Sequence, residues 1–338
     1  MRTLLVTVAA VVLAWPAAAH AQTVLRMGTP VPEGTAWARE IRTFARAVEN
    51  ETKGQVRFKI YFSGIAGDEL QAGERIRRDQ LDGVFSGGML CQRLAPTMRV
   101  MRILGLFQGR DELAYVMGRL KPGVDEEFRK SGFVNLGVVS VGPEFVFARK
   151  PIRTLAELKA TPLWTWDVDN TLGPSLDAMG FKAVHASLQD AARLYDEGKI
   201  DGFIAAPAAA LAFQWSAQAR HLVPLRLAML DACVLIANRA FDPLPEEHKA
   251  IIRHAAARGL GHLEDASRAQ DEALLGGLFA KQGLTTVPVS QQLRAQFFDE
   301  ARSLRERMND PQLPRSLIER VLSLLADYRA EHREIEAF

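Results

Sequence analysis

Two kinds of hydrophobic pattern alternate along most of the chain. In residues 56–62 the apolar side chains are separated by polar ones, which predicts a strand with one buried face. Residues 35–49 instead place their apolar side chains at helical spacing, and residues 23–30 before them predict another strand. This order of short strands and amphipathic helices indicates an α/β fold.

Several helix boundaries are marked by residues that satisfy free backbone groups. Thr154 and Glu157 have capping-box spacing, which predicts a helix start. Ser187 is a candidate cap for a later helix, and Gly198 is its candidate terminator.

Two stretches of the chain resemble each other. RRDQLDGVFSGG (77–88) and YDEGKIDGFIAA (195–206) share a helix end, an apolar-Asp-Gly step and a small-residue strand. The Asp-Gly pairs at 82–83 and 201–202 are predicted to make tight turns from helix to strand. The alternative is a chance likeness, since unrelated helix-to-strand turns often look the same. Two similar halves agree with a chain of 338 residues, which exceeds the usual single core.

Helical patterns dominate the C-terminal third. Residues 245–281 predict one helix ~50 Å long at ~1.5 Å per residue, enough to run along two domains. Gly259 and Gly261 are the positions where it would bend. The last helix, from Leu313 to the end, has an apolar stripe that we expect to pack on its own domain; packing on a second copy is the alternative.

The N-terminus has the pattern of a secretory signal peptide. Met1-Arg2 precedes an apolar run that is too short to span a bilayer, and Ala19-His20-Ala21 has the small-x-small pattern of a cleavage site. We predict residues 1–21 to be removed by cleavage after Ala21 and the protein to be periplasmic. A net charge of +2 over 338 residues argues against nucleic acid as a partner.

The two cysteines, Cys91 and Cys233, lie far apart in the chain. An exported protein with only two cysteines does not depend on a disulfide framework. Two separate buried thiols are the favoured interpretation, and a single bridge is the alternative.

No catalytic, metal or phosphate-binding motif stands out. G-x-S-x-G, H-E-x-x-H, C-x-x-C pairs and G-x-x-x-x-G-K are all missing from the sequence. His248 and His254 fall on different faces of the long predicted helix. We therefore expect no cofactor, no metal and no enzymatic activity, which leaves an exported binding protein with its ligand between two domains.

Five ordered segments resemble the extracytoplasmic solute-binding proteins of TRAP transporters, the DctP family. They are LRMGTPVPEGTAWAREIRTFARAVENETKGQVRFKIYFSGIAGDE, RRDQLDG, RKPIRTLAELKA, GKIDGFIAAP and FDPLPEEHKAII. The resemblance implies a two-domain periplasmic-binding-protein fold with crossing hinge strands and a long bracing helix. Domain I would comprise residues 22–142 plus 232–270, and domain II residues 143–231 plus 271–338.

The chain departs from this family at its usual polar anchors. The family arginine that holds a ligand carboxylate corresponds to Trp164, and a second arginine corresponds to Glu144. The family asparagine corresponds to Ala205 or Ala206. Because an indole lacks the forked donors of a guanidinium, we predict that this protein does not bind the simple organic acids of its relatives. If it does bind one, Arg149 or Lys182 would have to replace the arginine.

The resemblance places a ligand site in the cleft, with Trp164 and Trp166 on one side of a strand. The favoured ligand is apolar or lipid-like; a cation held by ring faces with Glu144 as counter-charge is the alternative. Tryptophans that only fill the core are a third interpretation. The candidate ligand-binding residues are Pro30, Trp37, Asp68, Ser86, Gly87, Glu144, Phe145, Trp164, Trp166, Asp167, Leu188, Ala205, Ala206, Trp215 and Asp231.

The resemblance also implies how the protein works and with what. Domain closure on the ligand would create the surface that TRAP-type permease subunits recognise, and some relatives use a helical-repeat periplasmic partner. We expect a monomer. The alternatives are a sensory or relay binding protein without a permease, or a periplasmic enzyme built on the same scaffold.

Overall fold

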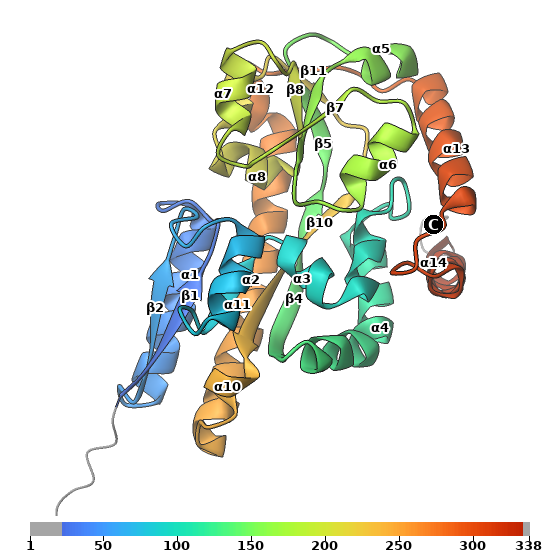
Figure 1. Cartoon of the computed structure of the whole chain (residues 1–338). Helices are drawn as coiled ribbons and strands as arrows, with labels where there is room; N and C mark the ends of the chain where they lie inside the picture. Colours follow the sequence, from blue (N-terminus) through green and yellow to red (C-terminus); the bar gives the residue numbers. More distant parts are fainter. Residues whose placement is uncertain (1–21, 334–338) are drawn as a thin grey trace, which may run out of the picture.

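The computed structural model describes residues 22–333, so the predicted signal peptide and its cleavage after Ala21 lie outside the described residues. The strands in this range form two sheets (Figure 1). One sheet has five strands in the order β2-β1-β3-β10-β4, and the other has six in the order β11-β9-β5-β8-β6-β7. Each sheet with its helices is called a lobe below, and the two lobes confirm the predicted α/β class.

The first lobe is built on a mixed sheet whose strand residues alternate between two cores. Val84 and Leu235 face one core, while Phe85 and Ile236 face the other, as expected for a sheet covered on both sides. The strands are β1 (Thr23–Gly28), β2 (Val56–Tyr61), β3 (Gly83–Ser86), β4 (Phe133–Pro143) and β10 (Met229–Ala237).

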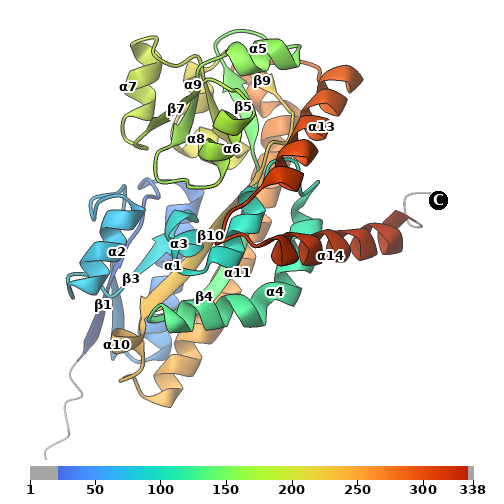
Figure 2. The ribbon, with the colours of Figure 1, turned by 45° about the vertical axis from the view of Figure 1, so that its right-hand side comes forward.

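Helices cover both faces of this sheet. One face packs against α1 (Ala36–Glu51), α10 (Asn238–Phe241) and α11 (Glu246–Ala273). The other packs against α2 (Glu69–Arg77), α3 (Met89–Leu94), the 3-10 helix η1 (Pro96–Arg102), α4 (Arg110–Lys130) and α14 (Arg315–Arg333) (Figure 2).

The second lobe repeats this arrangement around the six-stranded sheet. Its strands are β5 (Phe145–Ala148), β6 (Leu163–Trp166), β7 (Ala183–Ala186), β8 (Gly202–Ala205), β9 (His221–Val223) and β11 (Thr285–Thr286). One face packs against α5 (Leu155–Ala160), α6 (Leu172–Ala178) and α13 (Gln291–Arg307). The other packs against α7 (Ala191–Asp196), α8 (Pro207–Ala212), α9 (Trp215–Gln218) and α12 (Phe279–Lys281).

The lobes are joined by two strand crossings and one helix. β4 leads into β5, and the segment after β9 leads back into β10, which pairs antiparallel with β4. The predicted long helix is present as α11, which contacts both α1 and α8. It stays helical through Gly259 and Gly261, and the chain kinks instead at Gly277, inside the π-helical turn η2 (Leu274–Leu278).

The capping predictions have mixed outcomes. Thr154 and Glu157 form the predicted capping box at the start of α5. Gly198 follows the end of α7 with φ 69°, as predicted for a terminator. The predicted cap Ser187 is wrong by one turn, because Asp190 is the N-cap of α7 and the Ser187 hydroxyl hydrogen-bonds to Asp190 instead.

The paired Asp-Gly turns were predicted incorrectly. Gly83 and Gly202 are the first residues of β3 and β8, and neither has positive φ. A Cβ at Gly83 would overlap the Leu235 carbonyl oxygen, and one at Gly202 would lie 2.5 Å from the Phe147 carbonyl oxygen. Glycine is therefore needed at both positions for close strand packing rather than for a turn.

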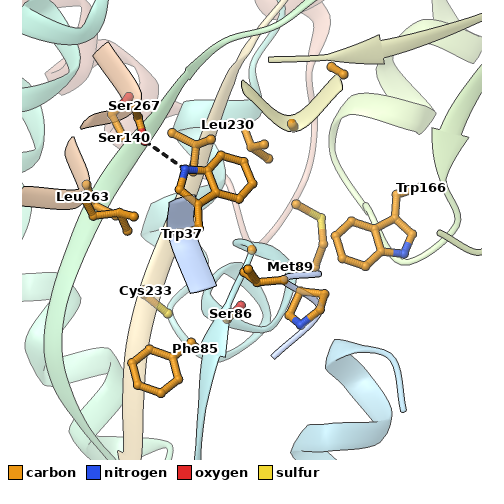
Figure 3. Close-up of a pocket in the computed structure, with 18 of the residues that line it drawn as sticks. Trp37, Phe85, Ser86, Met89, Ser140, Trp166, Leu230, Cys233, Leu263 and Ser267 are labelled. Atoms are coloured by element: carbon orange, nitrogen blue, oxygen red, sulfur yellow. Dashed lines mark hydrogen bonds between the residues drawn. The ribbon is translucent and has the colours of Figure 1, made fainter. Parts of the chain in front are cut away.

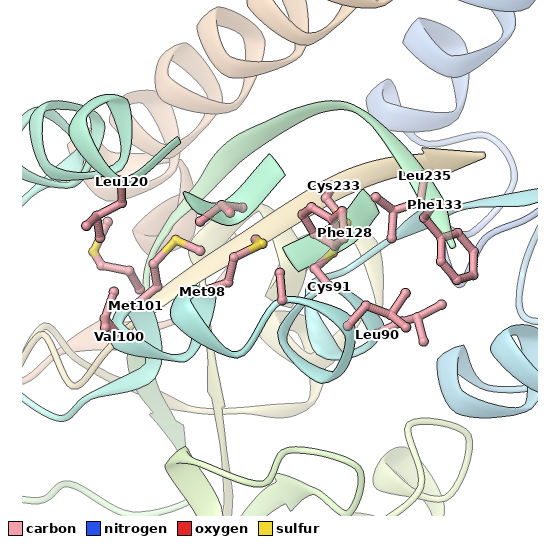
Figure 4. Close-up of a cluster of buried hydrophobic side chains, with 14 of the residues drawn as sticks. Leu90, Cys91, Met98, Val100, Met101, Leu120, Phe128, Phe133, Cys233 and Leu235 are labelled. Atoms are coloured by element: carbon pink, nitrogen blue, oxygen red, sulfur yellow. A yellow bond between two sulfur atoms is a disulfide. The ribbon is translucent and has the colours of Figure 1, made fainter. Parts of the chain in front are cut away.

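Two further expectations need correction. Cys91 and Cys233 form a disulfide between α3 and β10, rather than two separate thiols (Figure 4). Ile318 and Val321 of α14 pack in the first lobe on the core that contains α4, whereas residues 271–338 were predicted to lie in domain II. The other proposed domain boundaries stay predictions.

Candidate ligand-binding site

A cavity of about 140 Å³ lies between the two lobes and is called the interlobe cavity below (Figure 3). α1, β3, β4, β10 and α11 of the first lobe and β6, β8, α8 and α9 of the second contribute to its lining. At ~10–15 Å³ for each water-sized group, it holds roughly ten such groups. This is the size of a small organic molecule.

Aromatic rings form the wall on the side of the second lobe. The ring centroids of Trp164 and Trp215 are 4.8 Å apart, and that of Phe213 is 5.2 Å from Trp215. Phe203 stacks flat on Trp215 from behind, at 5.0 Å and 3°. Trp164 Nε1 donates to the Ala186 carbonyl at 3.1 Å, so this indole offers the cavity only apolar surface.

Two more tryptophans approach from different lobes. Trp37, on α1, donates from Nε1 to Ser267 Oγ on α11 at 3.1 Å (Figure 3). Trp166 belongs to the second lobe but reaches the first: a Cβ at Gly87 would lie 3.9 Å from its Cζ3. All four tryptophans within the described residues therefore line one cavity.

Below the aromatic wall lies a buried ionic cluster centred on Arg102. Its Nη1 donates to the Glu144 carboxylate and to the Met229 carbonyl, while Nε and Nη2 donate to Asp169 Oδ2 at 3.0 and 2.6 Å. The other oxygen of Asp169 accepts two backbone N–H bonds, from Thr171 and Leu172. The carboxylates thus occupy every nitrogen of the guanidinium.

The charged groups in this cluster shift one another's pKa values. Burial opposes the charge of Arg102, but Asp169 and Glu144 outweigh it and raise the pKa of the guanidinium. Burial raises the pKa of the Glu144 carboxyl, although Arg102 works in the opposite direction. Arg102 therefore stays charged and is neutralised by protein groups, which leaves it little attraction for a second carboxylate.

Two further carboxyls are buried close by. Glu69 accepts hydrogen bonds from Ser86 Oγ and from the backbone N–H groups of Gly87 and Leu90, so it occupies the place at the start of α3 that an anionic ligand would take. Asp231 accepts from Gln92 Nε2 at 3.0 Å, and burial raises its pKa to about 7. Carboxyl groups outnumber the guanidinium of Arg102 in this region.

The structure brings most predicted site residues to the cavity. Ten of the fifteen line it: Pro30, Trp37, Ser86, Gly87, Glu144, Trp164, Trp166, Leu188, Ala205 and Trp215. The other five lie outside the lining. Phe145, Ala206 and Asp231 are buried beside it, Asp68 caps α2 and Asp167 is exposed.

Sequence reasoning missed Arg102, which supplies the only guanidinium of the described residues in the lining. It comes from η1, far in sequence from Glu144 and Asp169, and no local motif marks it. The two cations considered instead are elsewhere: Arg149 bonds Asp201 and lies over the ring of Tyr195, and Lys182 is outside the lining.

Within the same described range, no cluster of three or more His, Cys, Asp or Glu side chains is arranged to hold a metal ion. None of the helices there combines the length and the hydropathy of a membrane span.

Known proteins with this architecture bind solutes. The structure of a sugar acid-binding protein from Advenella mimigardefordensis in complex with galactonate aligns with a TM-score of 0.84 at 16% identity, over 91% of this chain and 99% of that one. A Bordetella pertussis extracytoplasmic solute receptor binding pyroglutamic acid aligns with a TM-score of 0.80 at 16% identity, over 90% and 99%. A solute-binding protein of a Sulfitobacter species is 24% identical over 78% of this chain and 82% of its own length.

Two lobes joined by crossing strands, with a cavity between them, give this chain the same fold as these solved structures. Residues 27–311 match the DctP family, described as bacterial extracellular solute-binding protein, family 7. The chain belongs to this family, the solute-binding proteins of TRAP transporters.

Proposed function

We propose that this protein is the periplasmic solute-binding component of a TRAP-type transport system and that its ligand is apolar or lipid-like. The observation that carries the ligand class is that four hydrogen bonds to Glu144, Asp169 and the Met229 carbonyl engage every nitrogen of Arg102, beside an aromatic wall. The lobes would close on the ligand in the interlobe cavity and present it to a membrane partner.

A ligand carboxylate would meet an unfavourable site. To reach the guanidinium it would have to displace Glu144 or Asp169, each of which would then lie buried without its cation. Separating one partner from a buried ion pair typically costs ~3–5 kcal/mol of free energy. The position of the family arginine is occupied by Trp164, whose one donor is already used. Relatives that bind galactonate or pyroglutamic acid therefore do not predict the ligand of this chain.

An apolar ligand would gain from the same walls. An indole that buries ~200 Å² against a ligand contributes at most ~5 kcal/mol at ~25 cal/mol per Å². Trp37, Trp164, Trp166 and Trp215 all line the cavity, and because Trp37, Trp164 and Trp215 are each less than 10% exposed, each would contribute only part of this amount.

A cation is the second candidate, and the excess of buried carboxylates around Arg102 favours it. Its ammonium group would lie over a tryptophan face, near Glu144. Glu144 is already paired with Arg102, however, and Asp231 does not line the cavity, so this candidate ranks second.

Native mass spectrometry of protein purified gently from its exported location tests the ligand class. The bound compound is released by denaturation and identified. An apolar compound supports the proposal, an amine supports the second candidate, and a small carboxylate contradicts both. Protein denatured, refolded and incubated with spent growth medium serves as the control for adventitious binding.

The cellular role needs separate tests. We propose export with cleavage after Ala21, a monomeric state and delivery to TRAP permease subunits, directly or through a helical-repeat periplasmic partner. N-terminal sequencing of the exported protein tests the cleavage. A permease gene next to this one supports transport, its absence supports a sensory or relay role, and turnover of the bound ligand would reveal an enzyme.

A further inference from the structure

A second hollow, with a volume of about 430 Å³, runs along the edge strand β4 and is called the edge groove below. α4 and α11 form its two sides and β4 its floor. Figure 2 shows β4 between these two helices.

Small residues create this space. Ala114 and Gly118 lie one turn apart on α4, and Ala257 and Gly261 lie one turn apart on α11. No atom lies within 4 Å of a Cβ added at Gly118 or Gly261. Ordinary helix residues here would fill the groove, so its width follows directly from the sequence.

The inner surface of the groove is largely apolar and adaptable. Met101, Leu113, Met117, Leu136 and Val138 line it. Methionine side chains adjust easily to ligands of varying shape. The charged lining residues, Lys121 and Glu264, come from the two flanking helices.

The edge groove and the interlobe cavity share part of their lining. Val139, Ser140 and Leu260 belong to both. Leu260 lies against the α-carbon of Gly137, where an added Cβ would overlap its Cδ1, so glycine provides the room in which this side chain sits. The half-buried side chain of Leu260 therefore lies where the two linings meet.

A polar atom at this junction is unmatched. Ser140 is 8% exposed, and within the described residues its hydroxyl oxygen has no hydrogen-bond partner. The neighbouring hydroxyl, Ser267 Oγ, already accepts from Trp37. A buried hydroxyl without a partner is unfavourable, and a polar group of a ligand at this point would satisfy it.

We propose that the two spaces form one binding site for a single-chain lipid-like molecule with a neutral polar group. One end of the chain lies in the interlobe cavity and the other passes Leu260 into the edge groove, so that Ser140 Oγ bonds the polar group, part-way along the chain, at the junction. This inference rests on the proposed apolar ligand and extends it, because the interlobe cavity alone holds only roughly ten water-sized groups.

The test uses linear primary alcohols from hexanol to tetradecanol as probes. Tryptophan emission reports binding, because all four tryptophans of the described residues line the interlobe cavity. We expect affinity to rise about fourfold per methylene over the whole series. In Gly118→Leu, which fills the groove, the rise should stop at roughly ten carbons while short alcohols bind as before.

Gly123→Leu is the matched control, since Gly123 is an exposed glycine on the same helix with open space around it and lies outside the groove lining. Leu260→Ala should speed association of the long alcohols more than that of hexanol. Equal chain-length dependence in Gly118→Leu and Gly123→Leu overturns the edge-groove proposal but leaves the apolar ligand standing. Failure of every alcohol to bind overturns both.

Discussion

Asp231 makes the stability of this protein depend on pH in a direction opposite to that of most carboxylates. Its carboxyl is fully buried, and its one side-chain hydrogen bond comes from Gln92. Burial raises the pKa to about 7 from the ordinary value of 3.8. We therefore predict that Asp231→Asn stabilises the protein at alkaline pH and has no such effect in acid.

The sign follows from where the proton is held. Below pH 3.8 both the folded and the unfolded chain hold it; between 3.8 and about 7 only the folded chain does, so the free energy of unfolding falls as pH rises. The difference of 7 − 3.8 = 3.2 units corresponds to about 4 kcal/mol at ~1.36 kcal/mol per unit. Asparagine keeps an acceptor for Gln92 and never ionises, so Asp231→Asn should gain ~2–4 kcal/mol at pH 8.

Urea unfolding, followed by far-ultraviolet circular dichroism at pH 4 and pH 8, measures this effect. Asp265→Asn, at an exposed position on α11, is the control and should follow the wild type at both pH values. The reasoning is refuted if the free energy of unfolding changes by the same amount between pH 4 and pH 8 in the wild type and in Asp231→Asn.

Three other changes test separate parts of the structure. Trp164→Leu should weaken binding of the co-purified ligand by ~10–100-fold in calorimetry, through lost aromatic area, whereas Phe298→Leu, outside the cavity, should not. Replacing Cys91 and Cys233 together by alanine should lower the free energy of unfolding by ~2–5 kcal/mol in urea titrations, and equal stability of the two proteins would contradict the bridge. Asp271→Ala should lower the free energy of unfolding by ~3–5 kcal/mol, because it removes the ion-pair partner of Arg110, which is buried at the lobe junction. Unchanged thermal unfolding would contradict that role.

Local patterns were sufficient to predict much of the fold. Alternation in residues 56–62 gave β2, and the Thr154 capping box gave the start of α5, because each depends on neighbours within a few residues. The Asp-Gly pairs were wrongly predicted to make turns. Glycine is needed there because a Cβ would overlap a carbonyl oxygen on a strand distant in sequence. The Cys91–Cys233 bridge was missed for a similar reason: only the pairing of β3 with β10 brings the cysteines together.

Some residues of the candidate site could likewise be predicted from the sequence, and others could not. The four tryptophans could be placed at the cavity from strand periodicity and the family resemblance. The alternative with Glu144 as counter-charge of a ligand cation did not foresee Arg102, which bonds to Glu144. Arg102 reaches Glu144 and Asp169 from η1, a short helix with no signature of its own, so its role emerges only from the packing of three separate segments.

The passage of the chain between lobes limits the order in which the protein can fold. The first lobe is completed only when β10 and then α14 have been made. The second lobe begins at β5 and is completed by β11 and α13. The two cores that contain α13 and α14 therefore cannot be completed until the chain is almost complete. Late completion of these cores suits the export that we propose, in which the chain would cross a membrane before it folds.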